Sequence, residues 1–273
     1  ATAAVLAFAS AGQAQETVRI ATEGAYAPWN FTTADGKLDG LEVELANDLC
    51  ARMKVTCEIV AQDWDGLIPS LTVGKFDVIM ASMFITPKRL ETIDFTQPYA
   101  VDPSGFAVAK NSDLGKLGVS AEKFKLEDEA AAIAAIDKLK PLLQGKIVGV
   151  QAATTNLDFV KKYFGDTVEN REYKTTEQHH LDLAAGRIDG YISDIPAVEY
   201  YIKDKPQYRI ASRIPTAERY SFMFAKNFAD IAKVNDTLTA LKKEGFIAKV
   251  HQKWFGSMPP ADGATVKVLD MPK

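Results

Sequence analysis

The sequence predicts an α/β fold of two lobes, each built on a mainly parallel sheet flanked by helices. Strand and helix patterns alternate along the chain as βαβ units, which favours parallel sheets. The alternation is interrupted near the middle by a strand with prolines and then starts again. With 273 residues, the chain is long enough to bury two cores.

The first half alternates short apolar strands with amphipathic helices. We expect strands over 18–21, 56–61 and 76–81, and helices over 41–53 and 64–73. The second helix should end at Gly74, because glycine readily adopts the conformation that terminates a helix. Polar residues that follow these strands should gather at one edge of the sheet.

Pro98 and Pro103 interrupt the next strand, in residues 94–105. Proline cannot donate to a strand ladder, so this segment suits a hinge better than a central strand. Residues 114–143 then form a charged, alanine-rich stretch that can supply a surface helix.

A second α/β series follows. We expect strands over 146–151, 168–173, 187–194 and 208–212, with helices from 154, over 176–185 and over 196–203. A strand over 220–225 and amphipathic helices over 227–245 and 246–256 complete the pattern. The expected division is 15–101 and 215–273 for lobe 1, and 102–214 for lobe 2.

Residues 1–14 are small and apolar, without charge, and then give way to polar sequence. They resemble the end of a secretory signal peptide cleaved after Ala14; a buried N-terminal helix is the alternative. No other stretch approaches the roughly 18 apolar residues of a membrane span. The net charge of -4 argues against a nucleic-acid surface.

Cys50 and Cys57 are the two cysteines. Export favours a disulfide between them, with two buried free thiols as the alternative. Since no further Cys or His stands at ligand spacing, we expect no metal and no cofactor.

A candidate carboxylate site follows an apolar strand, in the run FDVIMASMFITPKR that ends at Arg89. A planar guanidinium beside small and hydroxylated residues can hold a carboxylate bidentately. Arg89 could instead be a solvated helix residue.

Several motifs occur in order along the chain: ATEGAYAPWNF, LDGLEVELANDLCARM, DWDGLIPSLTVGKFDVIMAS, ITPKR, FTQPY, GRIDGYISD and KWFG. Together they resemble the periplasmic amino-acid-binding proteins of ABC transporters, most closely the lysine/arginine/ornithine, histidine and opine binders. The resemblance covers the whole mature chain. It implies a type II periplasmic binding protein fold, with two lobes joined by two hinge segments and a ligand cleft between them.

The resemblance assigns Arg89 to the ligand's α-carboxylate, with a helix that starts at Thr86 adding a positive end. Ser82 corresponds to a hydroxyl or backbone donor, although it could be a small strand-end residue, and Ala81 could offer only backbone. Asp194 corresponds to the acceptor of the α-ammonium, and it could also cap the following helix.

Tyr26 and Trp64 correspond to an aromatic pair around the ligand's side chain, where stacking on a cation is worth roughly 0.5 to 2 kcal/mol. Ordinary core packing is the alternative. Glu23 stands where relatives place Asp, and an acid there favours a distal cation, unless Glu23 is a solvated loop residue. Glu42 is a weaker candidate for the same end.

Residues 154–156 begin a helix whose first turn, in relatives, gives the second lobe's grip on the carboxylate. Capping alone would explain Thr154, so Thr155 is the stronger candidate for ligand contact. Gln151 is expected to line the cleft.

Two features depart from the family pattern. Phe84 stands where relatives of the basic amino-acid branch carry a hydroxyl and opine binders a very small residue. Its ring argues against a bulky opine unless it turns away. By contrast, residues 114–143 resemble an insertion of the opine subgroup. We give Phe84 more weight, because it should face the pocket.

The resemblance implies an extracytoplasmic protein that captures a cationic or polar amino acid, or a derivative, and delivers it to an ABC permease. We expect a periplasmic monomer that is not an enzyme. Alternatives are an opine binder, a sensor, or a dehydratase-like enzyme with Glu23 as the acid or base. His179, His180 and His251 lie in polar helical stretches and are expected at the surface.

Overall fold

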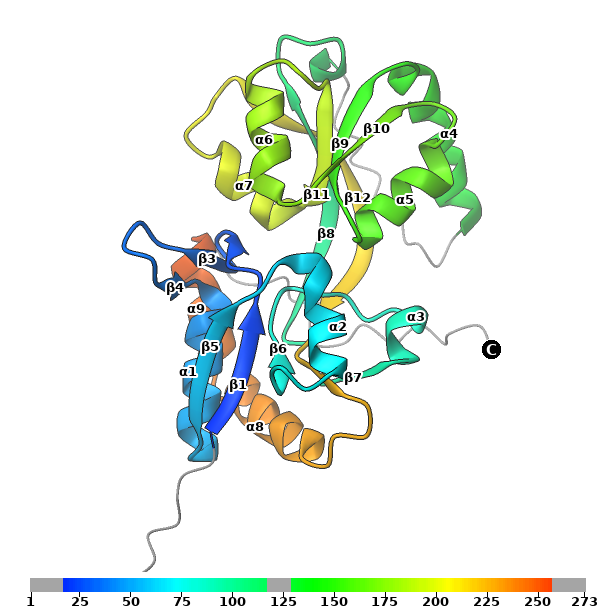
Figure 1. The fold of residues 1–273 in the computed structure, drawn as a ribbon. Coiled ribbons are helices and arrows are strands. Elements are labelled where there is room, and N and C mark those ends of the chain that lie inside the picture. Colours follow the sequence, from blue (N-terminus) through cyan, green and yellow to red (C-terminus); the bar gives the residue numbers. More distant parts are fainter. Residues whose placement is uncertain (1–16, 117–128, 257–273) are drawn as a thin grey trace, which may run out of the picture.

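The structure, a computed structural model, describes residues 17–116 and 129–256. It has two α/β lobes, one above the other in Figure 1, each with a five-stranded sheet flanked by helices. The predicted fold class is therefore confirmed. Predicted features in 1–16, including the signal peptide remnant, lie outside the described residues.

Lobe 1 carries the sheet order β5-β1-β6-β13-β7. Its strands are β1 (Thr17–Thr22), β5 (Thr56–Ala61), β6 (Val78–Ile79), β7 (Ile93–Phe95) and β13 (Met223–Ala225). Its helices are α1 (Leu41–Met53), α2 (Leu67–Thr72), α3 (Pro87–Leu90), α8 (Ile231–Lys243) and α9 (Phe246–Phe255), with a 3-10 turn η1 (Trp64–Gly66) before α2.

Lobe 2 carries the sheet order β10-β9-β11-β8-β12. Its strands are β8 (Ala100–Ala109), β9 (Ile147–Gln151), β10 (Glu169–Tyr173), β11 (Gly190–Asp194) and β12 (Tyr208–Tyr220). Its helices are α4 (Glu129–Leu143), α5 (Thr155–Phe164), α6 (Thr176–Ala184) and α7 (Ile195–Ile202), with a 3-10 turn η2 (Leu114–Lys116). Helix α4 is the helix predicted within 114–143.

Both sheets have the same pattern of strand directions. Three neighbouring strands run parallel, and the fourth strand, β13 or β8, is antiparallel to both of its neighbours. The long strands β8 and β12 pair with each other and connect the lobes (Figure 1). Strand β12 is longer than the predicted 208–212, because its pairing with β8 continues to Tyr220. The domain limits at 101/102 and 214/215 stay a prediction.

Two local features of lobe 1 differ from the predicted pattern. The predicted strand 76–81 shortens to β6, because the chain bends at residue 77 and again at residues 81 and 82. A small sheet of β2 (Ala25–Tyr26), β3 (Asn30–Thr32) and β4 (Leu38–Asp39) was not predicted, since such short strands carry little periodicity. This small sheet holds Tyr26 at the boundary between the lobes.

The predicted disulfide is present. Cys50 near the end of α1 and Cys57 in β5 are bonded, with their Cα atoms 6.1 Å apart. The bond joins the helix to the edge strand of lobe 1. No helix in the described ranges is long and apolar enough to span a bilayer.

The three histidines are buried, so their predicted surface position is wrong. His179 and His180 on α6 pack against Tyr191 and Tyr201, and His251 packs on Trp29. His179 stacks on Tyr191 and His180 on Tyr201, whereas His251 meets Trp29 edge-on. A polarity pattern does not reveal such contacts. Burial lowers the pKa of His179 to about 3 and that of His180 to about 4.

We predict that acid weakens lobe 2 through this histidine pair. The folded state holds both rings neutral, so the unfolded state binds more protons below about pH 6.5. The free energy of unfolding should therefore fall as the pH drops from about 6.5 to 4. Urea titrations across this range should show a shallower pH dependence for His179→Phe. Equal slopes for variant and wild type would contradict the prediction.

Candidate functional site

Five strands end at the boundary between the lobes, where their last residues or the turns after them meet. In lobe 1, β1 leads to Glu23, β5 to Trp64 and β6 to Ser82; in lobe 2, β9 ends at Gln151 and β11 at Asp194. Ligand sites of α/β sheets form at the carboxyl ends of their strands. The two sheets therefore face each other with the edges at which their parallel strands end.

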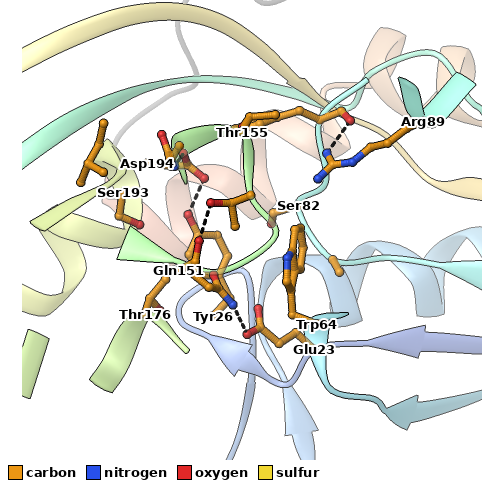
Figure 2. Close-up of a pocket in the computed structure, with 15 residues that line it drawn as sticks. Glu23, Tyr26, Trp64, Ser82, Arg89, Gln151, Thr155, Thr176, Ser193 and Asp194 are labelled. Carbon is orange, nitrogen blue, oxygen red and sulfur yellow. Dashed lines mark hydrogen bonds between the residues drawn. The ribbon is translucent and has the colours of Figure 1, made fainter. Parts of the chain in front are cut away.

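Eleven of the predicted ligand-contact residues line one pocket at this boundary (Figure 2). These are Glu23, Tyr26, Trp64, Ala81, Ser82, Phe84, Arg89, Gln151, Thr154, Thr155 and Asp194. Asn156, Thr176, Ile192 and Ser193 also line the pocket.

Asp194 lines the pocket and accepts four side-chain hydrogen bonds. Its Oδ2 accepts hydrogen bonds from Tyr26 Oη at 2.5 Å and from Tyr220 Oη at 2.7 Å. Its Oδ1 accepts from Asn156 Nδ2 at 3.1 Å and from Ser104 Oγ at 3.2 Å. Burial raises the pKa of Asp194, and these four hydrogen bonds oppose the rise. Its side chain makes no capping hydrogen bond to α7, so its predicted capping role is wrong.

Arg89 lies on another wall of the pocket, and both its backbone and its side chain contact neighbouring residues. Its Nη1 donates to the Phe84 carbonyl oxygen at 2.8 Å, and its guanidinium lies 5.7 Å from the centre of the Trp64 ring. The Arg89 amide donates to Thr86 Oγ1, which caps α3. With only four residues, α3 has too few aligned peptides for the predicted positive end.

Helix α5 begins on the lobe 2 side of the pocket. Thr154 caps it, accepting from the Leu157 amide at 3.2 Å and donating to the Gln151 carbonyl oxygen at 2.7 Å. Among the described residues, Thr155 Oγ1 is buried without a hydrogen-bond partner. Thr154 is thus used within the protein, whereas the Thr155 hydroxyl has no partner among the described residues, and its contact with a ligand stays a prediction.

The two turns that carry the pocket backbone each contain a non-glycine residue with positive φ. Ser82 follows β6 with φ 47°, and Ala153 follows β9 with φ 57°. Such residues cost energy and persist only where the surroundings hold them. For Ser82, the support is Glu42, whose Oε1 accepts from the Ser82 amide at 2.7 Å and from its hydroxyl at 3.1 Å.

Glu42 was a candidate for the distal end of the pocket, and this expectation is wrong. Its carboxylate is fully buried and also accepts from Asn30 Nδ2, at 2.6 Å, and from Tyr99 Oη. Burial raises its pKa, while these hydrogen bonds lower it. With both oxygens engaged beneath the Ser82 turn, Glu42 shapes the pocket from behind.

Two further hydrogen bonds cross between the lobes. Gln151 Nε2 donates to Glu23 Oε1 at 2.7 Å, and Trp64 Nε1 donates to the Ala153 carbonyl oxygen at 3.1 Å. Burial is the main reason that the pKa of Glu23 rises to about 8, and the charges of Glu42 and Asp63 add to it. At neutral pH Glu23 is therefore mostly protonated in this arrangement.

Phe84 lines the pocket, as predicted, but its ring is held to one side. It stacks on Tyr220 with ring centres 5.0 Å apart and an interplanar angle of 7°. Trp29 also packs on Tyr220, edge-on, with ring centres 4.8 Å apart. The phenyl ring is thus part of the lobe 1 core as well as of the pocket wall.

Sequence reasoning missed several residues of the site. Ser104 on β8 and Tyr220 on β12 come from the two connecting strands and became relevant only through contact with Asp194. Ser193 directly precedes Asp194 at the end of a strand, and Thr176 is the first residue of a predicted helix. Both positions could have indicated pocket residues from the sequence. In the described ranges, no group of His, Cys, Asp and Glu forms a metal site.

Two lobes of mainly parallel sheet, joined by two strands and enclosing a pocket at their facing edges, define a two-lobe solute-binding protein of the type II fold. Residues 18–257 match the model of the bacterial extracellular solute-binding proteins, family 3. The chain belongs to this family.

Relatives and a solved structure agree with the family assignment. The octopine-binding periplasmic protein of Rhizobium meliloti is 52% identical over 186 residues. The matched region covers 67% of this chain and 63% of the relative, so the chain spans less than two thirds of the length of this relative. The putative ABC transporter arginine-binding protein 2 of Escherichia coli is 31% identical over 259 residues, covering 93% and 96%. An ancestral arginine-binding protein bound to arginine has a TM-score of 0.74 at 30% identity, covering 89% of this chain and 99% of that one.

We predict that Tyr220→Phe destabilises the protein by roughly 1 to 3 kcal/mol, because a buried carboxylate loses one of its donors. The ring stacking on Phe84 is preserved in this variant. Urea unfolding measures the change, with Tyr200→Phe as a control that removes a hydroxyl from a half-buried tyrosine on α7. Equal losses of unfolding free energy in the two variants would contradict a specific stabilising contribution from the hydrogen bond to Asp194.

Proposed function

We propose that the pocket binds one amino acid, or an N-substituted derivative, through its α-carboxylate and α-ammonium. The observation that carries this proposal is a cation and a buried carboxylate, Arg89 and Asp194, on the walls of one pocket between the lobes. A zwitterion places opposite charges a few ångströms apart, so it can complement both walls at once. A simple carboxylic acid or amine could satisfy only one of them.

The carboxylate end would be shared between the lobes. Arg89 offers a guanidinium from lobe 1, and the first turn of α5 offers its amides and the Thr155 hydroxyl from lobe 2. Ser82 lines the same pocket, held by Glu42. Because these groups come from different lobes, a bound carboxylate would favour the closed arrangement.

The ammonium end would be Asp194. An unpaired buried carboxylate is unfavourable, and its pKa is already raised. A ligand ammonium would supply the missing positive charge and lower that pKa. Tyr26, which joins Asp194 across the lobes, would then adjust its hydroxyl to share the carboxylate with the ligand.

The side chain of the ligand would extend toward Glu23 and Gln151, beside the rings of Tyr26 and Trp64. A cationic side chain would lower the pKa of Glu23 and favour its ionised form, whereas a polar one could hydrogen-bond to Gln151. The named relatives bind arginine and octopine, ligands that share an amino-acid head and a guanidinium end. We therefore place arginine and octopine first among the ligands to test.

The proposed role is capture outside the cytoplasm and delivery to an ABC permease. Family membership and the periplasmic relatives support it. The lobes would close around the ligand by bending in the two connecting strands β8 and β12, and the closed monomer would dock on the permease.

We predict that Arg89→Ala weakens amino-acid binding by at least about 100-fold, since removing one partner of a desolvated charge pair costs roughly 3 to 5 kcal/mol. Calorimetry with arginine and octopine measures the loss. The matched control is Arg52→Ala, because Arg52 pairs with Asp48 and Glu244 at the surface. Wild-type affinity in Arg89→Ala would contradict the site assignment, and no binding of any amino acid or opine by the wild type would contradict the function.

We also propose that the protein binds its ligand without changing it. The acids that line the pocket, Glu23 and Asp194, are both engaged by hydrogen bonds, and the family is one of solute-binding proteins. Ligand recovered after prolonged incubation with a stoichiometric amount of protein should have an unchanged mass and NMR spectrum. Accumulation of a product that is absent with Glu23→Gln would favour an enzyme instead.

A further inference from the structure

Tyr99 lies where both connecting strands leave lobe 1. It immediately precedes β8, and its amide donates to the carbonyl oxygen of Tyr220, the last residue of β12, at 2.9 Å. Its ring packs on Phe222 with ring centres 5.0 Å apart. Tyr99 is 5% exposed and is not among the residues that line the pocket. Its hydroxyl donates to Oε1 of the buried Glu42.

Glu42 connects Tyr99 to two turns of lobe 1. The same Oε1 accepts from the Ser82 amide at 2.7 Å and from the Ser82 hydroxyl at 3.1 Å, and the Ser82 amide also interacts with Tyr99 Oη. Glu42 Oε2 accepts from Asn30 Nδ2 at 2.6 Å, and Asn30 Oδ1 accepts from the Gly24 amide at 2.8 Å. One carboxylate therefore links Tyr99 with the Ser82 turn and with the turn around Gly24.

The donors that hold the Glu42 carboxylate in the described part of the chain are all uncharged. They are a backbone amide, a carboxamide and two hydroxyls. Burial raises the pKa of Glu42, and these hydrogen bonds oppose the rise. When a buried carboxylate loses a donor, the remaining donors must compensate, or the acid stays unsatisfied. Loss of the Tyr99 hydroxyl should therefore act on the other donors of Glu42.

Among these donors, Ser82 is the one that lines the pocket. It has φ 47°, a conformation that a non-glycine residue keeps only with support from its surroundings. Both of its hydrogen bonds go to Oε1, the oxygen that Tyr99 also binds, whereas Asn30 binds Oε2. A change at Tyr99 should therefore alter the Ser82 turn first.

We propose that Tyr99 is a positioning residue for the ligand. Acting through Glu42, it ties the shape of the Ser82 turn to the lobe 1 ends of the connecting strands β8 and β12. This inference rests on the proposed amino-acid site. It adds a residue that touches no ligand and yet sets the affinity, because a side chain that contacts a ligand must be held in place by the groups behind it.

The hydroxyl of Tyr99 can be removed with little change to its packing. Tyr99→Phe keeps the ring that packs on Phe222. The matched control is Tyr173→Phe on β10, because Tyr173 also donates its hydroxyl to a carboxylate, that of Asp182, and does not line the pocket. Glu42→Ala, alone and combined with Tyr99→Phe, completes a double-mutant cycle, and thermal unfolding checks that each variant is folded.

Calorimetry with arginine and octopine should show at least a fivefold loss of affinity in Tyr99→Phe, for whichever probe the wild type binds, and less than a twofold change in Tyr173→Phe. In the Glu42→Ala background, Tyr99→Phe should change the affinity by less than twofold, because the hydroxyl has lost the group through which it acts.

Hydrogen exchange of the unliganded protein, followed by NMR, gives a readout that requires neither binding nor the Glu42→Ala variant. In Tyr99→Phe, the Ser82 amide should exchange at least fivefold faster than in the wild type, while the amides of β9 in lobe 2 keep their rates. A general loss of stability would instead raise the exchange of both groups together.

The positioning role is refuted if Tyr99→Phe binds the probes like the wild type, if Tyr173→Phe weakens binding equally, or if the full effect of Tyr99→Phe persists without Glu42. An unchanged exchange rate of the Ser82 amide would also refute it. If the wild type bound no amino acid or opine, the proposed function would fail, and the exchange measurement would still decide whether Tyr99 controls the Ser82 turn.

Discussion

The buried carboxylate of Asp194 is the interaction on which the arrangement of the lobes depends. Its four donors come from separate parts of the chain: Tyr26 from lobe 1, Asn156 from α5, Ser104 from β8 and Tyr220 from β12. A buried charge is tolerated only with such partners, and removing one leaves an uncompensated cost. In this arrangement, one side chain therefore links both connecting strands and both lobes.

A second buried acid, Glu42, does for the lobe 1 turn what Asp194 does for the lobe boundary. It holds Ser82 in a left-handed backbone conformation through the amide and the hydroxyl. Side chains that contact a ligand must themselves be held in place by a surrounding shell, or affinity is lost. The pocket thus depends on two carboxylates, of which only Asp194 lines it.

Several site residues could be predicted because strand ends carry a simple signal. Arg89, Ser82, Thr155 and Asp194 each follow or end an apolar strand or open a helix, and parallel strands bring such positions to one edge. The carboxylate-binding role of Arg89 follows from its guanidinium beside hydroxylated residues, whereas the roles of the other three came from the family resemblance; all four roles remain proposals. The fold class also followed from local pattern, since βαβ alternation restricts the choice of sheets.

Other features depend on contacts that local pattern does not encode. Tyr220 looked like an ordinary strand residue, and only the pairing of β12 with β8 brings its hydroxyl to Asp194. Glu42 resembled any acid of a first helical turn, yet it is buried beneath Ser82. His179 and His180 looked polar, and the stacking with Tyr191 and Tyr201 that buries them joins residues on different elements.

A crystal structure of the protein with a bound amino acid tests the central claim most directly, because it locates both ends of the ligand. The account predicts the α-ammonium within about 3 Å of Asp194 and the α-carboxylate between Arg89 and the first turn of α5. A ligand bound in the opposite direction, or one that contacts neither Asp194 nor Arg89, would contradict it.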